Sequence, residues 1–303
     1  MNDFLSSLGS KVAERWLNLL VLPGLLFLGV AIAGGGVLGH DHWHDIDRLR
    51  TRVNAMTTGP SAGKPGTIVL VSAATLLASA GLGLIVQALG TAIGQIWLRD
   101  PADPFSRLLV RWRCRRWAKR HSDYREAKIH HHRGQNDEGL LPSKEGLDRL
   151  RGRRDRIALI RPTRPTWSGD RMVAVDDRVR QLYGMDVAIV WPRLWLVLPG
   201  SVRTQLHNAR EAFSAATKLA AWGCGYAILG VWWWPALVIG AGTWIIAWRR
   251  VRTTIETLAV LIEASVDLHG NDLAERLRVS RPGHPFGPRI GKAVQQALRR
   301  PDP

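Results

Sequence analysis

The feature that most constrains this chain is Thr67–Leu98, a run of 32 residues with no Asp, Glu, Lys, Arg or His. As a helix rising about 1.5 Å per residue, it would be longer than the roughly 30 Å hydrocarbon core of a bilayer. Trp16–Gly39 is a second such run, of 24 residues. A cleaved signal peptide is the alternative for it, but the run is too long and no small-residue cleavage site follows. We therefore expect transmembrane spans at about residues 16–39 and 67–98, joined by an outer loop at 40–66.

The third apolar region, Leu219–Trp248, is 30 residues long and contains a proline after three tryptophans. It fits either one kinked span or a hairpin that turns near residues 232–235. Residues 99–218 hold 26 Lys and Arg and residues 249–303 hold 10, against 4 in residues 40–66. Because basic residues concentrate in cytoplasmic segments, the two rich segments belong on the same, inner side. This favours the hairpin, and it predicts a multi-pass plasma-membrane protein with four transmembrane helices and both termini in the cytoplasm.

The chain as a whole is expected to be mainly α-helical. Its two cysteines, Cys114 and Cys224, are far apart and exclude a disulfide framework. The 26 basic and 14 acidic side chains of residues 99–218 give that segment a net charge of +12. Such a segment is too long for a linker, so we expect a mostly helical cytoplasmic insert between spans 2 and 3. The predicted divisions are 1–98 (first hairpin), 99–216 (insert), 217–248 (second hairpin) and 249–303 (C-terminal helix and tail).

The first helix expected in the insert has one apolar face. Phe105, Leu108, Leu109 and Trp112 follow helical spacing, while arginines fill the other faces. Such a helix suits the membrane surface, with its apolar side chains in the interface and its arginines at anionic head groups. A solvated extension of the second span is the alternative interpretation.

Further along the insert we expect a helix at about residues 143–160, capped by Ser143, and another at 170–184, capped by Asp170. Residues 185–198 are rich in Val, Ile, Leu and Trp but contain a proline. They are expected to form a short strand or a buried connector.

Small and polar side chains follow one face of the second expected span. Their spacing is helical, and two glycines four residues apart permit close approach of another helix. The glutamine among them is more simply explained by an interhelical hydrogen bond than by a substrate contact. This face is expected to pack against another helix; its members are Ser79, Gly83, Gln87, Gly90 and Gly94.

The best candidate for a metal site is the segment that contains His40, His42, His44 and Asp45. Alternate histidines of an extended segment project to one face, and imidazoles with carboxylates suit zinc or copper. The segment lies where the chain would leave the membrane, however, and polar aromatic residues are common there. We expect a solvated interfacial loop and no cofactor.

The basic surplus has a simple explanation in the expected orientation, so nucleic acid is not an expected partner. None of the four spans carries Asp, Glu, Lys, Arg or His in its interior, which argues against a proton- or ion-coupled transporter. The expected partners are membrane lipids and a protein, or a second copy of the chain. The side chains expected to make these contacts are Arg111, Arg115, Arg116, Arg193, Arg249, Arg250, Arg252, Trp191 and Trp195.

Several short motifs occur together along residues 1–280. They are Glu14-Arg15-Trp16, Leu22-Pro23-Gly24, His40-x-His42-Trp43, Arg161-Pro162-Thr163-Arg164-Pro165-Thr166, Val190-Trp191-Pro192-Arg193 and Asp267-Leu268-His269. In these motifs the chain resembles a group of uncharacterised integral membrane proteins of actinobacteria. The resemblance implies a four-span protein of the bacterial cell membrane with a cytoplasmic insert, and it supplies no activity and no catalytic residue.

The sequence therefore favours a non-enzymatic membrane-anchored interaction module that contacts anionic lipids and a protein partner. An oligomeric pore or membrane effector in stress or phage defence is the main alternative, motivated by the small-residue face. An enzyme acting on lipid-linked substrates is a third, motivated by the histidine-rich loop and by Asp267-Leu268-His269 with Asp272.

Overall fold

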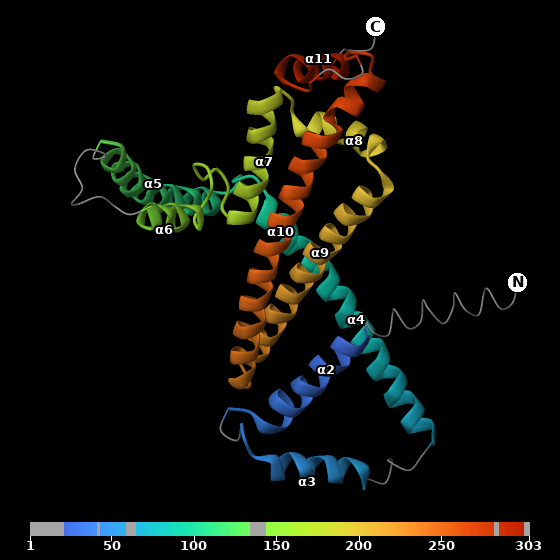
Figure 1. Cartoon of the computed structure of the whole chain (residues 1–303). Helices are drawn as coiled ribbons and strands as arrows, with labels where there is room; N and C mark the ends of the chain where they lie inside the picture. Colours follow the sequence, from blue (N-terminus) through green and yellow to red (C-terminus); the bar gives the residue numbers. More distant parts are fainter. Residues whose placement is uncertain (1–20, 41–42, 59–64, 134–143, 282–284, 300–303) are drawn as a thin grey trace, which may run out of the picture. The chain divides into compact units, whose positions relative to one another are not determined.

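Throughout the part of the chain that the computed structural model describes, the secondary structure is helical and contains no strand (Figure 1). The expectation of a mainly α-helical chain is confirmed. Two compact units are present: unit 1 takes residues up to 94 together with 214–249, and unit 2 takes 95–213 together with 250–303. The described residues are 21–40, 43–58, 65–133, 144–281 and 285–299.

Unit 1 is built from apolar helices with one short polar helix between them. A proline near the start of α2 suits the first turn of a helix, where a backbone N–H is not needed. The last part of α9 and the first part of α10 are joined by a turn at residues 230–234. The helices of unit 1 are α2 (Leu22–Val30), the π-helix η2 (Ala31–Leu38), α3 (Ile46–Thr57), α4 (Pro65–Leu98), α9 (Gly200–Leu229) and α10 (Pro235–Arg276).

Backbone-to-backbone approach at glycines holds unit 1 together. A Cβ added at Gly90 of α4 would lie 3.0 Å from the Cα of Lys218 in α9, and one added at Gly240 of α10 would lie 2.8 Å from the backbone nitrogen of Ala227. The hydroxyl of buried Ser79 donates to the carbonyl oxygen of Val21 at 2.6 Å. Side chains at these positions would push the helices apart, so small residues are required there.

Among the described residues, α4 alone is long and apolar enough to cross a membrane by length and composition. Its most apolar stretch has a mean hydropathy of 2.2, and only 11% of that stretch is buried. The first expected span begins at residue 16, but its residues 16–20 lie outside the described residues, and residues 22–38 form a shorter apolar helix. The charge-free parts of α9 and α10 are short.

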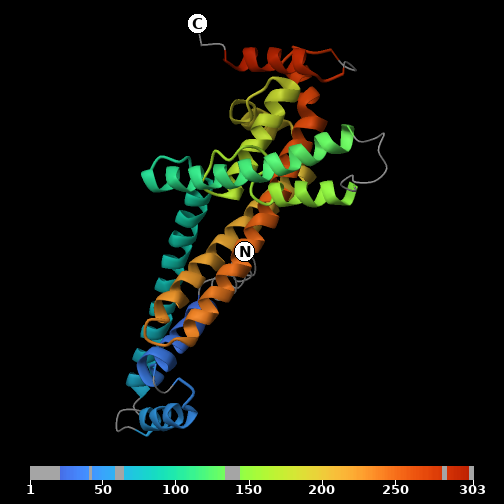
Figure 2. The same cartoon turned by 90° about the vertical axis from the view of Figure 1, so that its left-hand side faces the viewer.

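Unit 2 is a helical assembly with its own core. Within it, α5 and α6 lie side by side, and α11 packs against α7 and α8 (Figure 2). Met185, Leu194, Leu206, Val266 and Val294 are fully buried in its core. Its helices, besides parts of α9 and α10, are α5 (Pro104–Arg133), α6 (Lys144–Asp155), α7 (Trp167–Tyr183), α8 (Val187–Val197) and α11 (Pro288–Arg299).

Helix α5 is a separate element and does not continue α4. The chain leaves α4 at Leu98, Pro101 lies in the segment between the two helices, and Pro104 is the first residue of α5. The alternative in which the basic helix extends the second span is therefore not observed. Helix α5 also runs on to Arg133, through part of what looks in the sequence like a polar loop, because charged and polar side chains are compatible with an exposed helix.

Helix α7 begins earlier than predicted. Its N-cap is Thr166, whose hydroxyl accepts a hydrogen bond from the N–H of Gly169 at 3.0 Å, so the assignment of Asp170 as the cap is wrong. The helix ends as expected at Gly184, which has a φ of +68° and terminates the helix in the left-handed conformation that glycine adopts without strain. The preceding helix, α6, stops at Asp155 rather than near residue 160, and Ser143 lies outside the described residues.

The strand or connector expected at residues 185–198 is a helix instead. Asp186 caps α8 by accepting from the N–H of Ala188 at 2.9 Å, and Pro192 lies inside the helix. Leu194 and Val190, four residues apart, are buried on the same face. Burial of this face in the core of unit 2 outweighs the cost of the proline.

Candidate membrane-contact surface on α5

Three large apolar side chains of α5 are exposed. Phe105 is 70% exposed, Leu108 61% and Trp112 53%. They occupy positions i, i+3 and i+7, which fall on one face of the helix. A single exposed apolar residue is ordinary on a protein surface, but three on one face of one helix indicate a surface that meets something apolar.

Arginines surround this apolar face. Arg111, Arg115 and Arg116 are exposed, and within the described residues none of them forms an ion pair. The guanidinium carbon of Arg116 lies 4.6 Å from the centroid of the Trp112 ring, a distance suited to cation–π attraction. The face therefore combines an apolar patch with a uniform positive charge.

The opposite face of α5 is fixed to the loop that precedes α7, residues 156–166, which we name the clamp loop. Arg113 is 8% exposed and donates hydrogen bonds to the carbonyl oxygens of Ile157 and Arg164. The indole N–H of Trp117 donates to the carbonyl oxygen of Ala158 at 2.9 Å. These bonds set which face of α5 is turned outward.

Asp170 of α7 closes the clamp loop from the other side. It is 1% exposed, and its Oδ1 accepts from the backbone N–H groups of Thr163 and Arg164, both at 2.8 Å. Its Oδ2 lies 2.6 Å from Nη1 of Arg113, but the two atoms lack hydrogen-bond alignment, so the contact is an ion pair only. The side chain misassigned as a helix cap is thus the counter-ion of the buried arginine.

Arg252, predicted to contact lipid or a partner, is instead part of this internal structure. Its guanidinium lies 4.4 Å from the Trp167 ring centroid and donates to the carbonyl oxygen of Arg156 at 3.1 Å. Burial lowers the pKa of the Arg252 guanidinium, and the positive charges of Arg113 and Arg156 lower it further. These contacts give the half-buried Arg252 a structural role, and its contact with lipid or a partner stays a prediction.

The other predicted contact residues are divided. Arg193 and Arg250 are exposed, and Arg193 donates to the carbonyl oxygen of Ile189 in its own helix at 3.1 Å. Arg249 is exposed and makes an interaction within the chain. These three arginines belong to α8 and α10, so Arg111, Arg115 and Arg116 are the members of the predicted set that lie on α5.

The expected anchors Trp191 and Trp195 are packed against the core of unit 2. Their ring centroids are 6.2 Å apart, and the guanidinium carbon of Arg210 lies 5.5 Å from the Trp195 ring. Both rings are partly buried and pack against the core of unit 2, and their role as membrane anchors stays a prediction.

An ion-pair network between α7 and α10 was missed by the sequence analysis. Arg171 is 6% exposed and donates to Glu256 at 2.9 Å and to Glu263 at 2.8 Å. Arg178 pairs with Glu263 and with Asp267. Arg171 and Arg178 are seven residues apart, as are Glu256 and Glu263, and this matched spacing is the signal that could have found the network.

The ion-pair network changes the pKa values of Arg171 and Tyr183. Burial alone would lower the pKa of Arg171, but its hydrogen bonds to the two glutamates and their charges outweigh burial and raise it. The hydroxyl of Tyr183 donates to Asp267 at 2.9 Å. Burial, this hydrogen bond and the Asp267 charge raise the pKa of Tyr183 above its ordinary value, and Arg178 opposes the shift.

The histidine-rich loop of unit 1 has structural contacts. His40 Nε2 lies 2.7 Å from the carbonyl oxygen of Val231, which assigns the proton to that nitrogen. Asp45 caps α3 by accepting from the N–H of Arg48. The exposed His44 stacks edge-on with Trp43, and His42 lies outside the described residues. Across the residues that the structure describes, no three His, Cys, Asp or Glu side chains gather as a metal site would require.

The small-residue face of α4 is used inside the chain. Ser79, Gly83, Gly90 and Gly94 are buried. Gln87 is exposed, and Val86 occupies the buried position instead, so the assignment of Gln87 to this face is wrong. The residues on one packed face of a helix are separated by three or four positions in turn. Three positions after Gly83 lead to Val86 on the buried face, whereas four lead to Gln87, which lies beyond that face. With α2 and α9 covering this face, it no longer motivates an oligomeric pore.

The residues that motivated an enzyme are likewise engaged. Asp267 is held by Arg178 and Tyr183, while His269 Nδ1 lies 2.9 Å from Asp272.

Comparison of the chain with family models, with curated proteins and with solved structures finds no significant match.

Proposed function

We propose that this chain is a multi-pass integral membrane protein of the bacterial plasma membrane and that it acts as a non-enzymatic interaction module. Unit 1 forms the membrane anchor and contributes four spans: α2 with η2, most of α4, and the parts of α9 and α10 on either side of their turn. Unit 2 is cytoplasmic, and α5 holds it against anionic lipid while its remaining surface meets a protein partner.

The exposed apolar surface of unit 1 supports the membrane assignment. Leu70 is 72% exposed and Leu77 74%, both in α4, and Ile245 of α10 is 52% exposed. Soluble proteins rarely expose contiguous apolar surface of this kind, because each buried square ångström is worth about 25 cal/mol. A hydrocarbon environment removes that cost.

Contacts between the loop regions support the four-span arrangement. Trp43 follows the first span, and its ring centroid lies 5.0 Å from that of Trp234 in the turn between α9 and α10. His40 also contacts this turn. The end of η2 and the α9–α10 turn therefore lie at the same end of unit 1, as they must if both face the outside. Tryptophans at that end suit the membrane–water interface.

The single observation that carries the lipid contact is the exposed face of α5. The side chains of Phe105, Leu108 and Trp112 are large and exposed, so they can insert into the membrane–water interface. The arginines beside them then contact anionic head groups. Each basic side chain near such a surface is worth about 1 kcal/mol, and salt weakens the attraction.

The test uses the full chain reconstituted in nanodiscs, with a fluorophore on a cysteine at Leu108 and with Cys114 and Cys224 replaced by serine. We expect nitroxide-labelled lipids to quench the fluorophore in phosphatidylglycerol-containing discs, and high salt to reduce the quenching. The triple variant R111E/R115E/R116E should abolish it. Arg149, Arg151 and Arg153 of α6 are exposed as well, so R149E/R151E/R153E is the control with an equal change in charge.

Quenching that is the same in phosphatidylcholine discs, or that both triple variants reduce equally, would reject the α5 contact. The anchor is tested separately by labelling intact cells with a membrane-impermeant thiol reagent. We expect a cysteine at Thr51 to react from outside and one at Leu150 to react only after permeabilisation. The opposite pattern would reject the topology.

A further inference from the structure

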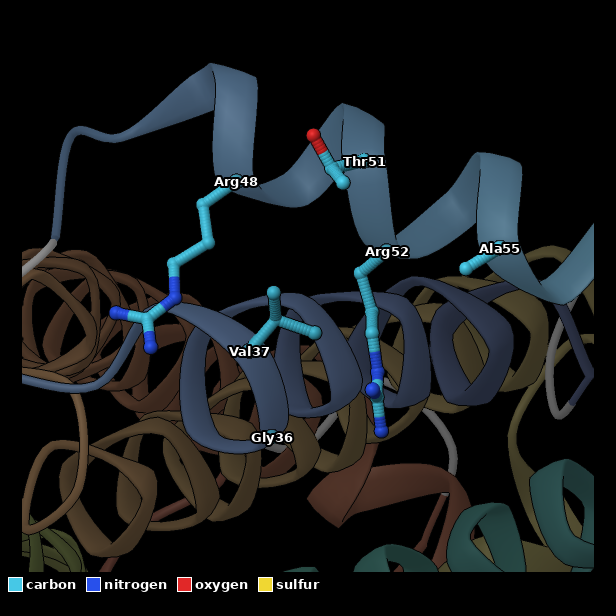
Figure 3. A pocket seen from close by; sticks show the side chains of 6 residues that line it. All are labelled: Gly36, Val37, Arg48, Thr51, Arg52 and Ala55. Carbon is cyan, nitrogen blue, oxygen red and sulfur yellow. The ribbon is translucent and has the colours of Figure 1, made fainter.

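A pocket lies between α3 and η2 in unit 1 (Figure 3). Its volume is about 300 Å³. Figure 3 shows Arg48 and Arg52 extending from α3 toward η2 on either side of Val37, with Gly36 on the helix below. The pocket is thus floored by small and apolar groups and flanked by two guanidinium groups.

The charge of this pocket is not balanced by the chain around it. Arg48 and Arg52 are four residues apart on one helix face, where like charges repel. In the part of the chain that is described, neither side chain forms an ion pair, although Asp45 and Asp47 lie at the start of the same helix; Asp45 caps that helix by accepting from the N–H of Arg48. Two adjacent guanidinium groups without an ion-pair partner favour an anion between them.

The shape of the pocket allows a group to enter between the arginines. A Cβ added at Gly36 would meet nothing within 4 Å, so the space above this glycine is open. Ile32, which precedes Gly36 by four residues in η2, is an apolar side chain that is 56% exposed on the same helix. An anion that also carries an apolar tail would therefore match both parts of the surface.

We propose that Arg48 and Arg52 bind the phosphodiester of a phospholipid in the outer leaflet, with one acyl chain lying along η2 past Ile32. This rests on the proposed function, which puts this end of unit 1 at the outer membrane surface. The planar guanidinium donates two parallel hydrogen bonds to phosphate oxygens, and a pair of them can hold one phosphate from two sides. The apolar floor selects a lipid over a free phosphate ion.

The test is native mass spectrometry of the full chain purified in mild detergent, with phosphatidylglycerol added as the probe. We expect R48Q/R52Q to weaken retention of one lipid about tenfold or more, the loss expected when charged hydrogen bonds to phosphate are removed. A Cβ at Gly36 meets nothing within 4 Å, so G36L is expected to occupy the open space and to weaken retention similarly. R50Q removes one charge from the same helix outside the pocket and should retain the lipid.

Equal loss in R50Q would overturn the proposal, because it would show a general charge effect. Displacement of the lipid by inorganic phosphate at low concentration would also overturn it, since the site would then bind a soluble anion. Retention in both R48Q/R52Q and G36L would do the same. The cysteine-labelling pattern of Thr51 and Leu150 reports on the anchor without involving this pocket's charge, so the two failures are distinguishable.

Discussion

Replacing Asp170 with alanine should destabilise unit 2 strongly. The change leaves the guanidinium of Arg113, 8% exposed, without its counter-ion, and it removes the acceptor of the Thr163 and Arg164 N–H groups. Breaking a buried ion pair from one side costs about 3–5 kcal/mol. For a unit of roughly 170 residues, that loss lowers the midpoint of thermal unfolding by about 6–20 °C.

The measurement is thermal unfolding in detergent micelles at one fixed scan rate, followed by circular dichroism and tryptophan fluorescence. Asp170→Asn keeps an oxygen for the two backbone N–H groups and loses only the charge, so its effect should be smaller than that of alanine. Asp177→Ala removes a carboxylate from the same helix that makes no ion pair among the described residues, and it should change stability by only about 0.5 kcal/mol.

A double-mutant cycle isolates the pair. In the Asp170→Ala variant the unpaired charge of Arg113 destabilises the fold. Arg113→Met should therefore lower the free energy of unfolding less in that background than in the wild-type chain. The difference should be about 0.5–3 kcal/mol. Strict additivity, or a loss below about 1 kcal/mol for Asp170→Ala, would refute the role assigned to this ion pair.

Two further predictions concern the two units separately. In unit 1, Gly90→Leu should lower the unfolding midpoint because the new side chain meets the backbone of Lys218, at a cost of about 1–3 kcal/mol; Gly242→Leu, with open space, is the control, and equal losses would argue against the close contact. In unit 2, the pKa of Tyr183 is raised above its ordinary 10.0, so the folded state holds that proton more tightly and its stabilisation, complete below pH 10, is lost as pH rises above it. Tyr183→Phe should flatten the fall in unfolding midpoint across this alkaline range, and an unchanged slope would count against the hydrogen bond to Asp267.

The helical character of the chain was predictable because its signals are local. The long uncharged run sets the end of α4 at Leu98, where Arg99 and two prolines follow. Gly184 marks the end of α7 for a similarly local reason, since its left-handed backbone conformation favours glycine. Such features depend on residues within one or two turns.

The contacts that build the α5 surface were not predictable, because they join distant parts of the chain. Arg113 and Asp170 are separated by 57 positions in sequence, and nothing in either neighbourhood indicates the partner. The apolar face of α5 was correctly placed on a helix, but its exposure depends on the clamp loop, which fixes the opposite face. The packing of Trp191 and Trp195 against the core of unit 2 was likewise not predictable, because the spacing of residues in the sequence does not reveal a contact between distant helices.

The glycine contacts of unit 1 have a consequence for how this anchor can change over evolutionary time. Where backbone meets backbone, as at Gly90 and Gly240, the chain tolerates almost no substitution. Outward-facing aliphatic residues can replace one another with little loss of stability. We therefore expect distant homologues to lose overall sequence identity while they keep the spacing between these small residues. That spacing is the pattern by which such homologues can be searched for.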